Sequence, residues 1–177
     1  IKTRSGEPVK LIDLIHEAIA RAKVAIETHR SDLSEEDLEE LSRILGIDAL
    51  KYADLSSHRQ RDYTFSFDRM LQFEGNTAAF LLYAYVRTSS ILEKANDFQK
   101  SASIELRHPS EISLALHLGR FDAAIEEMER DLVPHRLADY LYELAVKFNA
   151  FFRDCRTLGD PLQNSRLKLC SLTRSVL

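Results

Sequence analysis

The sequence is poor in residues that interrupt helices and in residues that crosslink a chain. Among its 177 residues are only 5 glycines, 4 prolines and 2 cysteines. A shortage of glycine and proline favours helices over a turn-rich sheet fold. The cysteines lack a CxxC spacing, which argues against zinc, and the absence of a disulfide framework fits a reducing compartment. Cys155 continues an apolar helical stripe, so we expect a buried free thiol there.

Long apolar runs are also missing. No stretch of about 18 apolar residues occurs, so we expect no membrane span. The chain opens directly on Ile1 and KTRSGE, without an apolar leader or an initiator methionine. We interpret it as a piece of a longer protein. Hydrophobic residues make up 45% and charged residues 29%, which is ordinary for a globular protein.

The short motifs of self-contained enzymes are absent as well. The sequence contains no HExxH, GxSxG, GxGxxG or Walker loop. Its six histidines form no zinc-ligand motif, so we predict no metal site. Glu126, Glu127 and Glu129 lie on the acidic side of a predicted surface helix, where we expect no catalytic role. The chain is therefore not expected to catalyse a reaction alone.

The net charge of −4 argues against general coating of a polyanion, but the charge is unevenly spread. Seven acids and one arginine between residues 32 and 48 give −6, and residues 122–131 carry −4. Residues 1–30 carry +2 and residues 156–177 carry +3. A nucleic-acid surface must therefore be local. The alternative is that all these segments are solvated helix faces.

Apolar spacing predicts two helices in the first third of the chain. Leucine, isoleucine and alanine recur at helical intervals over residues 11–22 and again over residues 38–45. Ser34 stands three residues before Asp37, which resembles a capping box with Asp in place of Glu or Gln. Gly46 follows the second apolar face and can interrupt or end that helix.

Further helices are predicted after residue 75. Residues 78–86, AAFLLYAYV, are apolar almost all round, so we expect a helix that is buried on most sides. Pro109 fits the first turn of another helix, with Glu111 favourable near its N-terminus and an end at Leu118-Gly119.

The pattern continues to the end of the chain. A helix over residues 121–132 is expected to point Ile125, Met128 and Leu132 inward. Pro134 then starts the clearest amphipathic helix, and residues 162–177 form a last one. The stripe of the amphipathic helix consists of Leu137, Leu141, Leu144, Ala145, Phe148, Phe151, Phe152 and Cys155.

The stretch KYADLSSHRQRDYTFSFD, residues 51–68, departs from this helical spacing. Lys51–Leu55 is expected to close a helix, and Ser56–Arg61 to form a polar turn. Tyr63–Phe67 alternates aromatic and small polar residues, which predicts a short extended segment. The predicted fold is therefore mainly α, an antiparallel helical bundle preceded by a helical connector with one strand-like segment.

Four blocks of the sequence resemble arginyl-tRNA synthetase, a class I aminoacyl-tRNA synthetase, in the same order. They are KTRSGEPVKLIDLI (2–15), ALKYADLSSHRQRDYTFSFDRML (49–71), GNTAAFLLYAYVRTSSI (75–91) and ADYLYELAVKFNAFFRDCR (138–156). The resemblance implies that residues 1–72 end the catalytic domain, and that residues 73–177 are an anticodon-binding bundle of the DALR type, truncated at its C-terminus. Residues 56–61 would then lie near the inner bend of the tRNA, with a solvated turn as the alternative.

The resemblance also assigns the first loop a role. Lys2, Thr3, Arg4 and Ser5 correspond to the KMSKS loop, which stabilises the transition state of adenylate formation with cations and hydroxyls. Ser5 stands in the region of the usual second lysine, so this loop departs from the common pattern. A solvated surface loop is the alternative.

For the anticodon site, the resemblance points to Phe80, Tyr83 and Arg87, at i, i+3 and i+7 on one helical face. Aromatic rings and a guanidinium can stack on and hydrogen-bond to the bases of a single-stranded loop. The same spacing also fits Phe80 and Tyr83 as core residues. Asn76 is a further candidate for tRNA contact, although a helix cap suits it as well.

The expected function is therefore tRNA recognition within arginine–tRNA ligase, which joins arginine to tRNA(Arg) with ATP and Mg²⁺ through arginyl-adenylate. The expected partners are tRNA(Arg), arginine and ATP, without membrane or DNA. The expected location is the cytoplasm, with mitochondrion and plastid left open. The rival interpretation is a helical module that binds a protein partner through acidic faces around residues 35–40 and 126–131, without binding RNA.

Overall fold

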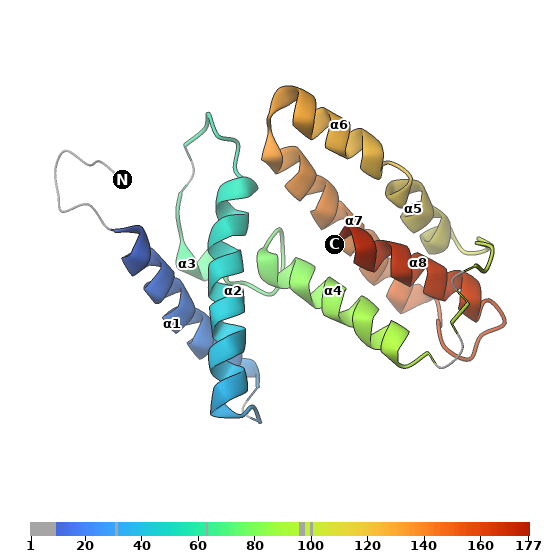
Figure 1. Ribbon diagram of the computed structural model, residues 1–177, viewed down its shortest axis with the longest axis horizontal. Coiled ribbons are helices and arrows are strands. Elements are labelled where there is room, and N and C mark those ends of the chain that lie inside the picture. Colours follow the sequence, from blue (N-terminus) through green and yellow to red (C-terminus); the bar gives the residue numbers. More distant parts are fainter. Residues whose placement is uncertain (1–9, 31, 63, 96–97, 100) are drawn as a thin grey trace. The chain divides into compact units, whose positions relative to one another are not determined.

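The computed structural model describes residues 10–30, 32–62, 64–95, 98–99 and 101–177, and these fold into helices connected by loops (Figure 1). No strand occurs among the described residues. The mainly helical class is confirmed. The helices are α1 (Leu11–His29), α2 (Glu35–Leu55), α3 (Phe67–Met70), α4 (Ala78–Glu93), α5 (Pro109–Leu118), α6 (Phe121–Asp131), α7 (Pro134–Asp154) and α8 (Gln163–Val176).

The contacts within the chain divide it into two compact units. The hairpin unit consists of Ile1–Asp54 and Asp62–Ala79, and the bundle unit consists of Leu55–Arg61 and Phe80–Leu177. The predicted domain boundary between residues 72 and 73 stays a prediction.

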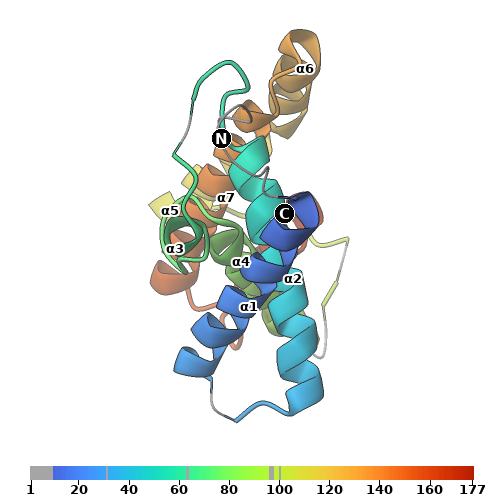
Figure 2. The same cartoon turned by 90° about the vertical axis from the view of Figure 1, so that its left-hand side faces the viewer.

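In the hairpin unit, α1 and α2 lie side by side and approach closely (Figure 2). A Cβ atom added to Gly46 would lie only 2.8 Å from the Cα and N atoms of Ile19. Ala18 and Ala22 of α1 are completely buried. The expectation that Gly46 interrupts or ends its helix is wrong, because α2 runs unbroken to Leu55. Gly46 lies at a close approach between the backbones of α1 and α2.

Ser34 caps α2 as predicted. Its Oγ accepts a hydrogen bond from the Asp37 backbone N–H at 3.1 Å and donates one to the Asp37 carboxylate at 2.6 Å. The Asp side chain thus meets the serine hydroxyl, which holds the cap in place.

The predicted extended segment ends earlier than expected. Tyr63 lies outside the described residues, and residues 64–66 have no regular structure. Phe67 does not continue the segment, because Ser66 caps α3 by accepting a hydrogen bond from the Arg69 N–H at 3.4 Å. The Phe67 ring packs against Phe65 at 4.8 Å between centroids.

In the bundle unit, α7 packs against α5, α6 and α8 (Figure 1). Pro109 and Pro134 begin α5 and α7, as the sequence predicted. Phe148 and Phe151 are completely buried, and Cys155 is a buried free thiol, which confirms both expectations. The buried core consists of Ala84, Ile91, Leu114, Tyr140, Leu144, Ala145, Phe148, Phe151, Cys155, Leu167, Leu169 and Cys170.

Two expectations about burial in this unit are wrong. Leu132 does not point inward: it follows the end of α6 with a φ of 53° and is 65% exposed. Helix α4 is not buried on most sides either, since Tyr83, Tyr85 and Val86 are exposed. The apolar character of residues 78–86 therefore includes a face open to solvent.

A buried charge network joins the start of α5 to α8. Glu111 is completely buried, and its carboxylate accepts hydrogen bonds from the backbone N–H groups of Arg107 and His108 at 2.7 and 2.8 Å. It also accepts one from Arg166 Nε at 2.6 Å. The Arg166 guanidinium in turn donates to the Arg156 carbonyl at 2.7 Å. The sequence predicted only that Glu111 stabilises the N-terminus of its helix. In the structure, Glu111 also holds a buried ion pair with α8.

Candidate functional site

An aromatic and cationic cluster occupies the facing sides of α4 and α7 in the bundle unit. It consists of Tyr83 and Arg87 from α4 and Asn149 and Phe152 from α7, and we call it the Arg87 cluster. The Arg87 guanidinium carbon lies 4.3 Å from the centroid of the Tyr83 ring and 4.5 Å from that of the Phe152 ring. Arg87 also donates to the Asn149 Oδ1 at 2.7 Å and to the Tyr83 hydroxyl.

Helical spacing explains how the cluster forms. Tyr83 and Arg87 are four residues apart and Asn149 and Phe152 are three apart, so each pair shares one face of its helix. The interior side of α7 is fixed by the buried rings of Phe148 and Phe151. Asn149 and Phe152, each one position further along, are thereby directed toward α4.

The cluster is partly open to solvent. Tyr83 is 54% exposed and Phe152 is 41% exposed, whereas Arg87 and Asn149 are half-buried. Exposed ring faces beside a guanidinium can stack on unpaired bases and donate hydrogen bonds to their edges. This combination is suited to a single-stranded nucleic acid.

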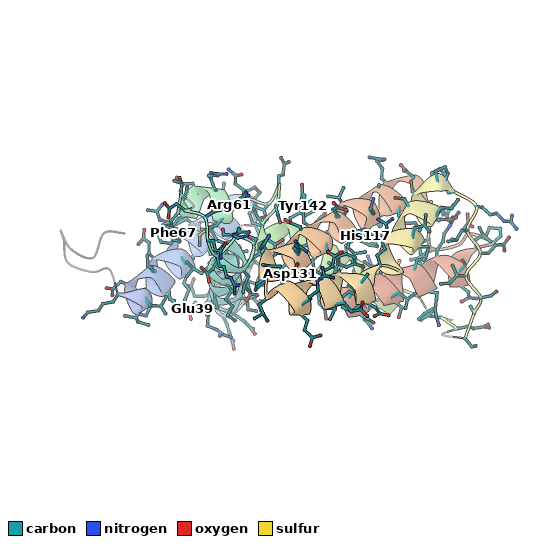
Figure 3. All side chains as sticks on the ribbon, turned by 90° about the horizontal axis from the view of Figure 1, so that it is seen from above. Glu39, Arg61, Phe67, His117, Asp131 and Tyr142 are labelled. Atoms are coloured by element: carbon teal, nitrogen blue, oxygen red, sulfur yellow. The ribbon has the colours of Figure 1, made fainter. Side chains whose placement is uncertain are left out.

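The structure separates the predicted anticodon residues into different surroundings. Tyr83 and Arg87 are in contact, as their shared face predicted. Phe80 is half-buried against the core, and its ring lies 5.5 Å from that of Tyr142, which Figure 3 labels. Asn76 belongs to the hairpin unit, where its Oδ1 accepts a hydrogen bond from the Tyr52 hydroxyl at 2.5 Å.

The predicted KMSKS-like loop, Lys2, Thr3, Arg4 and Ser5, lies outside the described residues. The polar turn Ser56–Arg61 is present: the His58 Nδ1 accepts a hydrogen bond from the Gln60 N–H at 3.1 Å. Its ring lies 4.7 Å from that of His135, at the start of α7.

Sequence reasoning missed Asn149 and Phe152 as site residues. Phe152 was assigned to the apolar stripe of α7, yet it lies at the stripe's edge and covers Arg87 instead of entering the core. The only feature of the sequence that could have indicated their role is their position, one residue after Phe148 and one residue after Phe151.

A second polar surface lies beside His117, at a groove of about 470 Å³ between α5, α6 and α7. Arg136 in this groove pairs with Asp131 at 2.8 Å and with Glu127 at 3.7 Å (Figure 3 labels His117 and Asp131). Arg120 also lines the groove, but so do the acids Glu127, Asp139 and Glu143, which makes it poorly suited to a polyanion. The Arg87 cluster is the better candidate for RNA.

The described part of the chain offers neither a membrane-spanning helix nor a cluster of metal ligands. No helix there is long and apolar enough to cross a membrane. Within the same residues, no three His, Cys, Asp or Glu side chains gather as a metal ion would require.

Comparison with known proteins places both parts of the chain in one family. Residues 81–177 match the family model described as DALR anticodon binding domain, and residues 1–67 match that of the class I tRNA synthetases (R), catalytic domain. An arginine–tRNA ligase from Chlamydia felis is 51% identical over 178 residues, which cover 99% of this chain and 32% of the relative. The chain thus spans about a third of the length of the curated relatives it matches.

Comparison with solved structures points to the same family. The arginyl-tRNA synthetase of Plasmodium falciparum matches 96% of this chain and 31% of its own, with a TM-score of 0.82 and 39% identity. The arginyl-tRNA synthetase of Thermus thermophilus matches 95% of this chain and 30% of its own, with a TM-score of 0.80 and 30% identity. The rival interpretation, a helical protein-binding module, finds no support in these matches. The chain belongs to the arginyl-tRNA synthetase family, and its bundle to the DALR anticodon-binding domains.

Proposed function

We propose that this chain is the tRNA-recognition part of an arginine–tRNA ligase that acts in the cytoplasm. The whole ligase would join arginine to tRNA(Arg) through arginyl-adenylate, with ATP and Mg²⁺. Support comes from the two family models and from relatives named arginine–tRNA ligase. Since the chain corresponds to about a third of those relatives, we assign it tRNA binding and no catalysis of its own.

The observation that carries this proposal is the Arg87 cluster within the DALR match. Its exposed rings and its guanidinium are the groups that recognise bases splayed out from a single-stranded loop. The anticodon loop is such a loop. Tyr83 would stack on a base, and Arg87 would donate hydrogen bonds to a base edge.

The net charge of the chain agrees with an RNA contact that is confined to a small surface. The chain carries a net charge of −4, so its affinity for RNA must come from a small number of cationic contacts. Phosphate contacts release counterions, and binding should therefore weaken as the salt concentration rises.

The test is filter binding of this chain to a tRNA(Arg) transcript and to a transcript with a scrambled anticodon, at several salt concentrations. We expect salt-sensitive binding that is tighter for tRNA(Arg). Tyr83→Ala and Arg87→Ala should each weaken it by roughly 5- to 150-fold, the range for loss of one base-stacking contact or of one bidentate contact to a base edge. Tyr85→Ala is the matched control, because Tyr85 is exposed on the same helix but lies outside the cluster.

The same substitutions can be made in a whole ligase that contains this chain. There we expect a lower kcat/KM for arginylation of tRNA(Arg). Unchanged kcat/KM in both variants would show that the anticodon assignment is wrong, and no binding of the chain at low salt would favour a protein-binding role.

A further inference from the structure

We propose that Asn149 is a positioning residue that fixes Arg87 between the Tyr83 and Phe152 rings, so that Arg87 reads a base edge and does not stack on a base. This inference rests on the proposed function, because it concerns the same tRNA site. It assigns α7 a part in specificity that the sequence did not indicate.

The two rings restrict what Arg87 can do. They lie 4.3 and 4.5 Å from the guanidinium carbon, so two aromatic rings already contact the guanidinium. A base that stacked on the guanidinium would have to compete with these rings for its faces. The donors on the edge of the plane are what Arg87 can offer to RNA, and a guanidinium fork fits a base edge that carries two adjacent acceptors.

Asn149 sets the direction of that edge. Its Oδ1 accepts a hydrogen bond from Nη1 at 2.7 Å, while the Tyr83 hydroxyl accepts one from Nη2. An arginine side chain has several rotatable bonds, and fixing them before RNA arrives reduces the entropy lost on binding. Asn149 can hold this position because it stands between the buried residues Phe148 and Phe151 on α7.

Phe152 closes the cluster from the α7 side. Its ring centroid lies 4.5 Å from the guanidinium carbon, and the residue is 41% exposed. Without Phe152, the guanidinium would be more accessible for stacking on any base, because stacking depends little on sequence. We therefore expect its loss to reduce discrimination between bases more than affinity.

The experiment measures the Kd of the chain for a tRNA(Arg) transcript and for transcripts with single anticodon substitutions. Asn149→Ala should weaken binding of the cognate transcript by about 5- to 20-fold, because it loses a charge-assisted hydrogen bond that orients Arg87. For the transcripts with anticodon substitutions, the Kd of the Asn149→Ala protein should stay within about 2-fold of the Kd of the wild-type protein. Asn149→Asp keeps the acceptor, so it should preserve the ratio between transcripts even if the added negative charge weakens all of them.

A double-mutant cycle separates positioning from packing. In an Arg87→Ala background, Asn149→Ala should change binding by less than about 2-fold, since its effect passes through Arg87. A purely structural role would instead lower the melting temperature and weaken all transcripts equally in both backgrounds. Val146→Ala, an exposed position on α7 one turn before Asn149, is the control for the helix itself.

The possible results distinguish the two proposals. If Arg87→Ala weakens cognate binding but Asn149→Ala and Phe152→Ala keep wild-type discrimination, the positioning role is wrong and the proposed function stands. If Tyr83→Ala and Arg87→Ala also bind like the wild type, the proposed function fails. Should Phe152→Ala fail to fold by circular dichroism, Phe152→Leu removes the ring while retaining apolar volume, and it should show the same loss of discrimination.

Discussion

Glu111 and Arg166 stand 55 residues apart in the sequence, yet their side chains form an ion pair of 2.6 Å inside the bundle unit. Glu111 is completely buried, and the Arg166 side chain is 11% exposed. Burial alone would disfavour both charges, but the carboxylate also receives two backbone N–H groups. The pair is therefore well compensated. Arg166 also pairs with Asp160 at 3.1 Å, so removing Glu111 would leave the arginine with one counter-charge in place of two.

The first prediction concerns pH. Burial of Glu111 raises its pKa, but its backbone hydrogen bonds and Arg166 outweigh this, so the pKa lies below its ordinary value of 4.5. A carboxylate with a lowered folded-state pKa stabilises the fold above the unfolded-state pKa, and this stability is lost as the pH falls through the folded value. We expect Glu111→Gln to destabilise the protein by about 1–3 kcal/mol at pH 7, because Asp160 remains as a partner of Arg166, and by progressively less below pH 4.5.

Urea unfolding of both proteins at neutral and acidic pH measures this difference. Glu126→Gln, an exposed position on α6, should change stability by less than about 0.5 kcal/mol at either pH. A difference between wild type and Glu111→Gln that does not shrink on acidification would rule out the charge as its cause.

The second prediction concerns the contact between α1 and α2. Gly46→Ala should destabilise the hairpin unit by about 1–2 kcal/mol, since the overpacking cost exceeds the gain in helix propensity. The new Cβ would meet backbone atoms of Ile19 at 2.8 Å, and backbone cannot move aside as a flexible side chain can. Gly119→Ala is the matched control, because its nearest atoms lie at 3.6 Å and its φ is −66°. Equal unfolding midpoints for the two variants would contradict the close approach.

The third prediction concerns Leu132, whose φ of 53° is a left-handed conformation that a leucine adopts at a cost of roughly 1–2 kcal/mol. Leu132→Gly relieves this strain but increases the entropy of the unfolded chain, so we expect a net gain of about 0.5–1 kcal/mol. Thermal unfolding measures the gain. Leu116→Gly, at a similarly exposed position within α5, should instead cost about 1 kcal/mol. Destabilisation by Leu132→Gly would mean that the side chain contributes more than its backbone strain costs.

The sequence predicted helices well where a local cause determines them. Pro109, Pro134 and the Ser34 cap act within one turn, and the structure confirms all three. The expectation for Gly46 was wrong because it considered only the helix that contains the glycine. The role of Gly46 depends on a second helix, more than 20 residues away in the sequence. The Glu111–Arg166 pair has the same origin, since no local pattern links residues 55 positions apart.

The candidate site was predicted only in part, for a related reason. Helical spacing identified Tyr83 and Arg87 as neighbours, because both lie on one helix. Phe80 has the same kind of spacing but packs against Tyr142, which periodicity could not distinguish from an exposed position. Asn149 was absent from the predicted site because its partner is on another helix.

Neighbouring residues of α7 have different surroundings. Phe148 and Phe151 are buried in the core, whereas Asn149 and Phe152 contact Arg87. Successive residues on a helix are about 100° apart, because a turn takes 3.6 residues. Inserting or deleting a single residue early in α7 would therefore turn polar Asn149 toward the interior or an aromatic ring away from it. The register of this helix is therefore fixed by the core and by the Arg87 cluster together.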